Sequence, residues 1–511
     1  MERYIILGVT GVLVLMLLSA VITGLKRGIV KSAIRVATIA LSIPLAILTL
    51  NVIKKTSFFE KIINRIDLSN FGIDVTQLSG NIDALATALV MPIAFIIIFF
   101  LISKLTYFIY LIFKIFLGRA INNHNLVGKG VSKTVGVLIS LIGAFITFYG
   151  TFCPLNGYVG VLAEAQTYTK EESYQTDFKQ VVKITNSAKE LRSHFLFSSN
   201  AKFSDKIFNN LTDIKYKTLN GEETYSTNLK KEILGTVELL PSVKDFSGLT
   251  KKEENIDYAK IRASVKSIGD YSGDNSVLTA KILINYVTVQ LGEKAPDYVG
   301  NYGQKYFDIV NPLLEEMKAS TMNTANEKLV TALNVFGALN ETLTYLDTLE
   351  NNTYTGDGVQ IKAIMNFIEP DSWTQYTRPL MKKSTLDNGG SNAEALAEVV
   401  VNIFDELYLI KQNGGDLDAE CLKADRTFIA TYKCAKKADE LTPKMVNDMI
   451  DAVLDSELLQ NAINNVNQGG YKISNITASD KEKIKGLLTE RKTYENESVL
   501  NNIASIFDIT L

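Results

Sequence analysis

Four long apolar runs dominate the first 155 residues of the chain. They cover residues 5–24, 32–53, 84–117 and 134–152, and the rest of the 511-residue sequence has no comparable run. A helix needs about 20 apolar residues to cross the hydrocarbon core of a bilayer, which offers an open backbone no hydrogen-bond partners. The pattern therefore predicts a four-helix transmembrane domain over residues 1–155.

The first run is predicted to be a retained membrane helix rather than a cleaved signal peptide. A signal peptide carries its cations before its apolar stretch. Here the charges before the run nearly cancel, and the cations that follow it are Lys26, Arg27, Lys31 and Arg35. This basic stretch predicts a tight loop, around residues 24–28, held on one side of the membrane.

Residues 156–511 have the features of a large helical domain. Apolar residues recur at helical spacing over 396–410, and Gly414-Gly415 then ends the stripe. Sequences typical of helix starts are Thr250-x-x-Glu253, Ser391-x-x-Glu394, Ser479-x-x-Glu482, Asn311-Pro312 and Thr442-Pro443. The β-branched run 277–291 admits a strand, but its length favours a helix. We expect an all-α fold, with a subdomain break near 351–358 or 387–392.

Lys and Arg residues in the short connections indicate the orientation. The connections at residues 26–35 and 104–133 carry nine cations together and no acid, whereas residues 54–83 mix four cations with four acids. Because cytoplasmic loops collect Lys and Arg, the first two connections are expected in the cytoplasm. Both termini and residues 156–511 are then expected to be extracytoplasmic.

The charge balance changes at the same boundary. Residues 1–155 hold 14 Lys+Arg and 5 Asp+Glu, a net charge of +9, whereas the rest holds 39 and 50, a net charge of −11. An acidic outer domain makes nucleic acid an unsuitable partner, because phosphates bind cationic surfaces. The expected partners are the lipid bilayer and another envelope protein or a second copy of the chain.

Short motifs in the membrane part resemble those of the colicin V production protein family. The matching residues are Gly24, Lys26, Arg27 and Gly28, in a Gly-x-(Lys/Arg)-Arg-Gly turn, then Lys133 and Gly136. Members usually have a second glycine four residues after the one matching Gly136, where this chain has Ser140. The resemblance covers residues 1–155, about 30% of the chain. It implies a bacterial inner- or plasma-membrane protein with proposed links to secretion, toxin biosynthesis and envelope maintenance; typical members lack the large domain.

Two segments of the membrane part leave alternatives open. Gly136, Ser140 and Gly143 gather near one face of the fourth run, and either pack closely against another helix or are ordinary glycines and serines of membrane helices. Apolar residues at helical spacing over 58–66 fit either an amphipathic helix in the interface or a short helix packed under the outer domain.

The sequence contains no catalytic, metal-binding or cofactor-binding constellation, so we expect neither enzyme activity nor a bound cofactor. His124 and His194 are expected on opposite sides of the membrane, with His194 inside a helix. Cys421 and Cys434 would lie about 20 Å apart within one helix, so they are either free buried thiols or partners across a hairpin. The acidic residues at 270–275 and 416–418 fit helix caps better than calcium ligands, and Trp373 is expected to be a packing anchor rather than a carbohydrate platform.

Lys104 in the third run has two possible positions. If the crossing covers residues 84–103, Lys104 lies at the cytoplasmic boundary and its side chain reaches the headgroups. If the crossing covers residues 93–113, Lys104 lies near mid-membrane, where a charge costs about 2.5–3.5 kcal/mol and usually marks function. The flanking charges Asp83 and Lys104 bound a span of the right length, which favours the boundary position.

Two functions from different classes fit these features. The first is an envelope scaffold or secretion and assembly factor, in which the membrane domain anchors an external helical binding domain. The predicted topology and the capped helices support it. The alternative is an oligomeric transport or channel component, which the small-residue face of the fourth run and Lys104 support.

Overall fold

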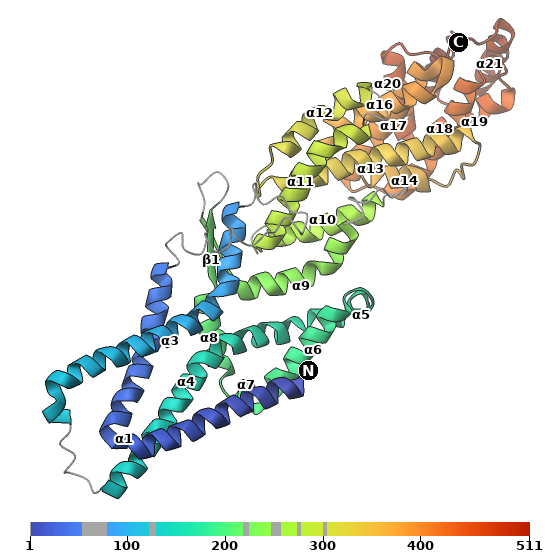
Figure 1. Ribbon diagram of the computed structural model, residues 1–511. Coiled ribbons are helices and arrows are strands. Elements are labelled where there is room, and N and C mark those ends of the chain that lie inside the picture. Colours follow the sequence, from blue (N-terminus) through green and yellow to red (C-terminus); the bar gives the residue numbers. More distant parts are fainter. Residues whose placement is uncertain are drawn as a thin grey trace. The chain divides into compact units, whose positions relative to one another are not determined.

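The computed structural model describes residues 2–53, 79–121, 129–217, 224–246, 257–272, 277–299 and 304–511. These residues are predominantly helical, as predicted (Figure 1). The chain divides into two compact units, one made of residues 1–244 and 267–283 and the other of residues 245–266 and 284–511. The segments 58–66 and 122–128, and with them His124, lie outside the described residues.

Three helices in the described part of the chain are long and apolar enough to cross a membrane. They belong to α1 (Glu2–Ile53), α3 (Ser79–Ile121) and α4 (Lys129–Ala165), all in the first unit. The prediction of four separate membrane helices is therefore wrong in its count. The first two apolar runs are joined in one helix, α1, that turns a corner instead of passing through a loop (Figure 1).

The corner of α1 is Gly28, the single residue inside it with non-helical dihedral angles. Its φ is 69° and its ψ is −174°, a conformation that only glycine adopts without strain. Gly28 divides α1 into arm 1, residues 2–27, and arm 2, residues 29–53. At 1.5 Å per residue each arm is about 38 Å long, enough to cross a hydrocarbon core of about 30 Å.

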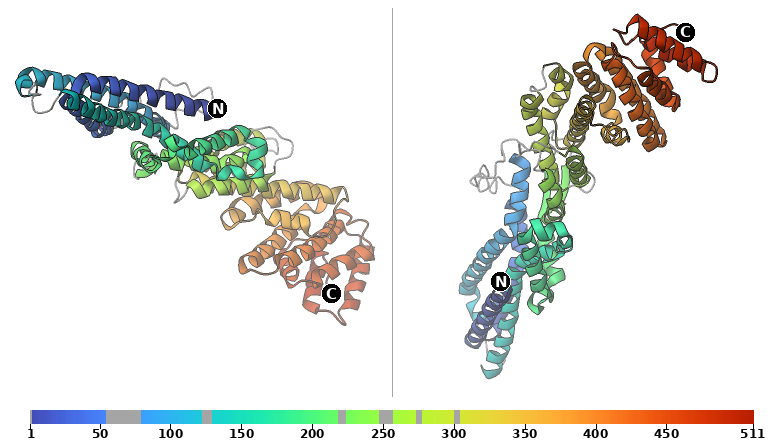
Figure 2. Two further views of the ribbon diagram at one scale, coloured as in Figure 1. Left: turned by 90° about the horizontal axis from the view of Figure 1, so that it is seen from below. Right: turned by 90° about the vertical axis from the view of Figure 1, so that its right-hand side faces the viewer.

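Helix α4 packs against both arms, and α3 packs mainly on arm 2 (Figures 1 and 2). Arm 1 contributes Ile6, Val9, Leu13 and Met16, which surround the α4 residues Phe148 and Phe152. Arm 2 and α3 share a core made of Ile39, Ala46, Leu50, Met91, Phe95 and Phe99. The three long helices therefore form one packed bundle in which the third predicted run continues as a single helix containing Pro92.

The rest of the first unit consists of shorter elements. They are η3 (Tyr168–Lys170), α5 (Glu172–Asp177), α6 (Lys179–Ser193), α7 (Phe195–Ser198), α8 (Ala201–Leu211), β1 (Asp213–Lys217), β2 (Thr224–Asn228) and α9 (Leu229–Phe246). The strands β1 and β2 pair antiparallel from Asp213 opposite Asn228 to Lys217 opposite Thr224. This hairpin is the departure from the expected all-α fold within the described residues.

The run 277–291 is helical, as predicted, and lies within α11 (Leu278–Val299). Its first turn is capped by a distant side chain, Glu232 of α9. The Glu232 carboxylate accepts hydrogen bonds from the backbone N–H groups of Leu278, at 2.8 Å, and Thr279, at 3.0 Å. Glu232 is buried, so these donors supply the partners that a buried carboxylate requires. The helix α10 (Tyr258–Ser272) precedes this segment.

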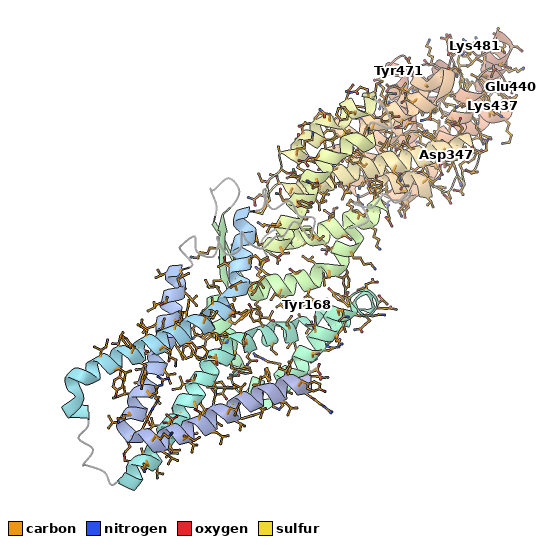
Figure 3. All side chains as sticks on the ribbon, in the orientation of Figure 1. Tyr168, Asp347, Lys437, Glu440, Tyr471 and Lys481 are labelled. Carbon is orange, nitrogen blue, oxygen red and sulfur yellow. The ribbon has the colours of Figure 1, made fainter. Side chains whose placement is uncertain are left out.

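The second unit is helical in all its described elements. It contains parts of α10 and α11 together with the elements that follow them in the chain. These later elements are α12 (Gln304–Lys318), α13 (Ala325–Glu350), α14 (Val359–Met365), α15 (Pro370–Ser372), η6 (Trp373–Thr377), α16 (Arg378–Asn388), η7 (Gly390–Asn392), α17 (Ala393–Asn413), α18 (Leu417–Lys436), α19 (Pro443–Leu454), α20 (Glu457–Gln468), α21 (Ala478–Arg491) and α22 (Glu497–Ile506). The two expected subdomain breaks are turns inside this unit, before α14 and before α17. Its surface carries charged side chains, among them Asp347, Lys437 and Glu440 (Figure 3).

The stripe at 396–410 forms the buried face of α17, which lies in the core of the second unit. Gly414 ends this helix with φ 71°, as predicted. Asp425 of α18 is buried and accepts hydrogen bonds from Tyr345 Oη at 2.5 Å and from Gly358 N at 2.9 Å. These bonds hold α13, α14 and α18 together at one point of the core.

The predicted helix starts have different outcomes. Thr442 caps α19, because its hydroxyl oxygen accepts a hydrogen bond from Met445 N at 3.3 Å. Asn311-Pro312 is wrong as a helix start, since Pro312 lies inside α12. The predicted helix start at Ser391 is also wrong, because Ser391 lies in the 3₁₀ turn before α17.

The predicted start at Ser479 is displaced by two residues. The capping residue of α21 is Thr477, which accepts a hydrogen bond from Asp480 N at 3.1 Å. Thr477 Oγ1 also donates to Asp480 Oδ2 at 2.7 Å, so the two side chains are joined at the start of the helix. The segment Thr250-x-x-Glu253 lies outside the described residues.

Candidate functional site

The glycines of the family-like motif meet where α4 crosses the corner of α1. A Cβ atom added to Gly24 would lie 2.5 Å from Val137 Cα and 2.7 Å from Gly136 O. A Cβ atom added to Gly136 would lie 2.7 Å from the carbonyl carbon of Gly28. The backbones of α1 and α4 touch here, and only residues without a side chain permit this approach.

Serine side chains continue this contact on both sides of the glycines. Ser132 Oγ accepts a hydrogen bond from Ile29 N at 3.5 Å, and Ser140 Oγ donates to Ser32 Oγ at 2.9 Å. Farther along α4, Gly143 lies against Val36 of arm 2. The small-residue face of the fourth run therefore packs against another helix, and that helix is α1 of the same chain.

The cations of the motif surround this contact. Lys26 and Lys133 are exposed, whereas Arg27 and Arg35 are half-buried. The guanidinium carbons of Arg27 and Arg35 lie 6.0 and 4.5 Å from the ring centroid of Tyr107 in α3. The three long helices thus meet in one basic layer at the Gly28 corner, where a ring face interacts favourably with each cation.

A cavity of about 490 Å³ lies between arm 1, arm 2 and α4, next to this basic layer. We call it the arginine cavity; its lining residues include Arg27, Arg35, Ser32, Ser140, Val12, Leu15, Met16, Val36 and Ile39. Two cations and two hydroxyls thus share one cavity with an apolar wall. In the sequence, Arg27 belongs to the family-like motif and both arginines serve as topology signals, but no sequence signal shows which distant helices enclose them.

Lys104 does not line the arginine cavity. Its side chain is exposed, and it lies on α3 three residues before Tyr107, which belongs to the basic layer. Three helical residues advance about 4.5 Å along the axis. Lys104 is therefore close to the level of Arg27 and Arg35, and its place at the membrane boundary stays a prediction.

A buried polar network fixes the end of α4 to the helices that follow it. Asn156 is fully buried, and its Nδ2 donates to Phe197 O, Asn200 Oδ1 and Ser204 Oγ at 2.9–3.1 Å. Its Oδ1 accepts from Arg192 Nη1 at 3.0 Å, and Arg192 also pairs with Asp205 at 2.6 Å. Residue 155, the expected end of the membrane domain, thus lies inside a helix that continues into this network.

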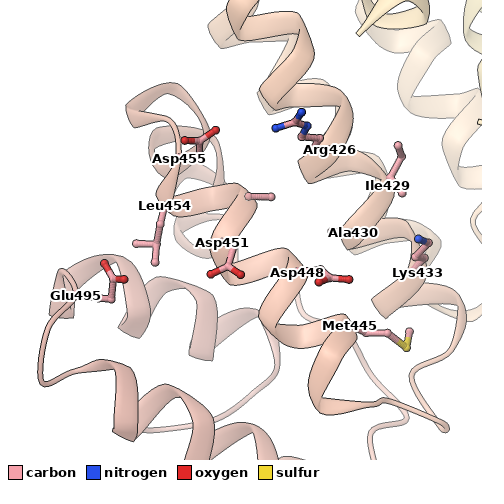
Figure 4. A pocket seen from close by; sticks show the side chains of 11 residues that line it. Arg426, Ile429, Ala430, Lys433, Met445, Asp448, Asp451, Leu454, Asp455 and Glu495 are labelled. Atoms are coloured by element: carbon pink, nitrogen blue, oxygen red, sulfur yellow. The ribbon is translucent and has the colours of Figure 1, made fainter. Parts of the chain in front are cut away.

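The second unit contains a cleft of about 720 Å³ between α18 and α19 (Figure 4). Helix α18 contributes Arg426 and Lys433, the facing helix α19 contributes Asp448 and Asp451, and Asp455 directly follows α19. Between them lie apolar side chains, among them Ile429, Met445 and Leu454. We call it the α18–α19 cleft; charges of both signs surround its apolar groups.

The other candidate residues have structural roles. The prediction that His194 lies inside a helix is wrong. His194 caps α7, and its Nδ1 accepts a hydrogen bond from Leu196 N at 3.3 Å. Asp416 caps α18 by accepting from Ala419 N at 3.1 Å. Trp373 is buried and donates to Asp405 at 2.9 Å, so it is a packing residue.

The thiols and carboxylates form no metal site in the described residues. Cys421 and Cys434 both lie on α18 and are free and buried, so the alternative of a bond across a hairpin is excluded. Within the part of the chain that the structure describes, no three His, Cys, Asp or Glu side chains are grouped to hold a metal ion. A comparison of the chain with protein-family models, curated proteins and solved structures finds no match.

Proposed function

We propose that this chain is a bacterial envelope scaffold related to the colicin V production family, in which the bundle of α1, α3 and α4 anchors a helical binding domain outside the cytoplasm. In this proposal each arm of α1 crosses the bilayer once, so the bundle makes four crossings. The basic layer at the Gly28 corner then faces the cytoplasm, because cytoplasmic ends collect Lys and Arg.

The α18–α19 cleft is the observation that carries the proposal. Its charged groups already take part in ion pairs: Asp448 binds Lys444 at 2.8 Å, and Asp451 binds Arg491 at 2.6 Å. Such pairs position charges at the rim of a binding surface, where they select a partner and speed its approach. We expect the partner to be another envelope protein that presents complementary charges around an apolar group.

The small-residue face of α4 no longer supports the alternative hypothesis of an oligomeric transport component. That hypothesis used the small-residue face of α4 as a contact between copies. In the structure, Gly136, Ser140 and Gly143 face arm 1 and arm 2 of the same chain, so this face is already covered. The scaffold is therefore the function that we propose.

A crosslinking experiment in living cells tests this proposal. A photoreactive amino acid at Ala452, which lines the cleft, should capture one defined partner protein. The same amino acid at Lys437, which is exposed but does not line the cleft, serves as the matched control. The double substitution Asp448→Lys and Asp455→Lys should remove the adduct at position 452. An adduct that forms equally at both positions, or that survives the charge reversal, would contradict the proposal.

A further inference from the structure

The arginine cavity has a chemical character that the scaffold function does not use. Arg27 and Arg35 lie at one end, together with the Ser32 and Ser140 hydroxyls. Val12, Leu15 and Met16 of arm 1 line another side, and Val12 and Leu15 are also exposed on the outer face of the bundle. The cavity volume of about 490 Å³ falls within the range of about 300–1,000 Å³ that small-molecule sites occupy.

The two arginines have no carboxylate partner nearby in the sequence. No Asp or Glu occurs over residues 3–59 or 84–163, which include arm 2, all of arm 1 except its first residue Glu2, the apolar part of α3 and most of α4. Among the described residues neither arginine forms an ion pair; their shared neighbour is the ring of Tyr107. Two like charges that share a half-buried site repel each other, so an anion bound between them would be favoured.

We propose that the arginine cavity binds one anionic glycerophospholipid, with its phosphate held by Arg27 and Arg35 and an acyl chain along the apolar wall. A guanidinium group presents a planar fork of donors that matches phosphate oxygens. A free phosphate ion would leave the wall formed by Val12, Leu15 and Met16 without a partner, whereas an acyl chain covers it.

The position of the site favours the same ligand. Basic pockets between membrane helices on the cytoplasmic side are suited to anionic headgroups. The inference rests on the membrane embedding proposed above. Alkaline carbonate extraction tests that embedding separately, because an embedded chain stays in the membrane pellet whether or not it binds a particular lipid.

Titration of the full-length, detergent-solubilised chain followed by native mass spectrometry tests the proposal. Phosphatidylglycerol should bind as a single retained lipid, and phosphatidylcholine and inorganic phosphate should not compete with it. Each arginine is expected to contribute about fivefold to the affinity, so Arg27→Gln with Arg35→Gln should weaken binding about 25-fold. Lys26→Gln is the matched control, because Lys26 lies on the same corner but does not line the cavity.

Three results would overturn the proposal. Equal retention of phosphatidylcholine and phosphatidylglycerol would show that the cavity does not select charge. Saturation of the site by inorganic phosphate alone would assign it to a soluble anion. Wild-type lipid binding by the double arginine variant, at an unchanged melting temperature, would place the lipid elsewhere.

Discussion

Ser140 Oγ donates a hydrogen bond to Ser32 Oγ at 2.9 Å, across the contact between α4 and arm 2 of α1. Ser140 occupies the position where the family that the membrane part resembles usually has a second glycine. The two hydroxyls satisfy each other in a setting that offers few other partners, and each adds only one atom beyond Cβ. A serine pair thus fits this close contact without separating the helices.

The close approach at the Gly28 corner predicts the effect of alanine substitutions. Gly24→Ala and Gly136→Ala should each destabilise the chain by about 1–3 kcal/mol, because the added Cβ atom would meet backbone atoms of the facing helix at 2.5–2.7 Å. Gly8→Ala and Gly11→Ala are the matched controls, since nothing lies within 4 Å of their Cβ positions. They should be neutral or stabilising, because glycine inside a helix costs about 0.5–1 kcal/mol relative to alanine. Thermal melting in detergent compares the four variants. If Gly24→Ala and Gly136→Ala melt at the same temperature as the two controls, the close contact between the helix backbones is contradicted.

The buried network at the end of α4 makes Asn156 sensitive to substitution. Asn156→Ala should lower the free energy of unfolding by about 2–5 kcal/mol, because it removes the three bonds that Nδ2 donates and the bond that Oδ1 accepts from Arg192. Asn210→Ala on α8 is the control, since Asn210 is exposed, and it should change stability by about 0.5 kcal/mol or less. A loss of similar size in both variants would show that the network does not stabilise this junction.

The two cysteines of α18 should be unreactive in the folded chain. Burial raises the pKa of Cys421 to about 12 and that of Cys434 to about 12. Because the thiolate is the reactive form, iodoacetamide at pH 8 should modify neither residue until the chain is unfolded. Rapid modification of either residue under native conditions would show that α18 opens easily.

The same shifts give a sign for the pH dependence of stability. A thiol whose folded pKa is raised stabilises the fold fully below its unfolded pKa of about 8.5, and this contribution declines as the pH rises toward 12. Cys434→Ala should therefore flatten the decline in unfolding free energy between pH 9 and pH 12 relative to the wild type. Trp373, the single tryptophan, is buried in the second unit and reports its unfolding by fluorescence. An unchanged slope in the variant would contradict this assignment.

The topology has a direct test with engineered cysteines. Asn351→Cys should react with a membrane-impermeant maleimide in intact cells, because residues 156–511 are proposed to lie outside the cytoplasm. Lys26→Cys should react only after permeabilisation, because the Gly28 corner is proposed to be cytoplasmic. Both side chains are exposed and the three native cysteines are buried, so the background should be low. The opposite pattern would show that the orientation is inverted.

Lys104 should tolerate replacement by another polar residue. An exposed lysine near the basic layer needs only to reach the headgroups, so Lys104→Gln should leave membrane insertion and the crosslink at Ala452 nearly unchanged. Immunoblotting of the membrane fraction measures both. A variant that inserts and accumulates normally but loses the crosslink at Ala452 would contradict this prediction and assign Lys104 a functional role.

Local patterns in the sequence predicted elements well where a single helix face decides the outcome. The stripe at 396–410 predicted α17, and Gly414 predicted its end. Both signals are local, because the spacing of apolar residues and a glycine with left-handed dihedral angles each depend on only a few neighbouring positions. The start at Asn311-Pro312 failed because a proline can also lie inside a helix, as Pro312 does in α12. The predicted start at Ser479 failed because Thr477, two residues earlier, has a hydroxyl that can cap the helix in the same way.

Contacts between distant segments could not be predicted from one sequence. The motif glycines were recognised as a turn, but nothing at Gly24 or Gly28 indicates that Gly136 is their partner. The arginine cavity and the Asn156 network have the same origin, since each joins helices that are separated by tens of residues or more. Asn156-Gly157, four residues after the apolar run 134–152 ends, is the one local sign of the Asn156 network, because an amide there needs buried partners.

The contact between Ser32 and Ser140 can form only some time after Ser32 has been synthesised. The two residues are 108 positions apart, and chains are made at about 5–20 residues per second, so roughly 5–20 s pass before the second serine exists. During that interval the Gly28 corner has emerged from the ribosome, while the helix that covers its backbone has not. A factor that shields newly inserted hairpins would have its greatest effect on this protein in that window, and slower translation of residues 33–139 would lengthen it.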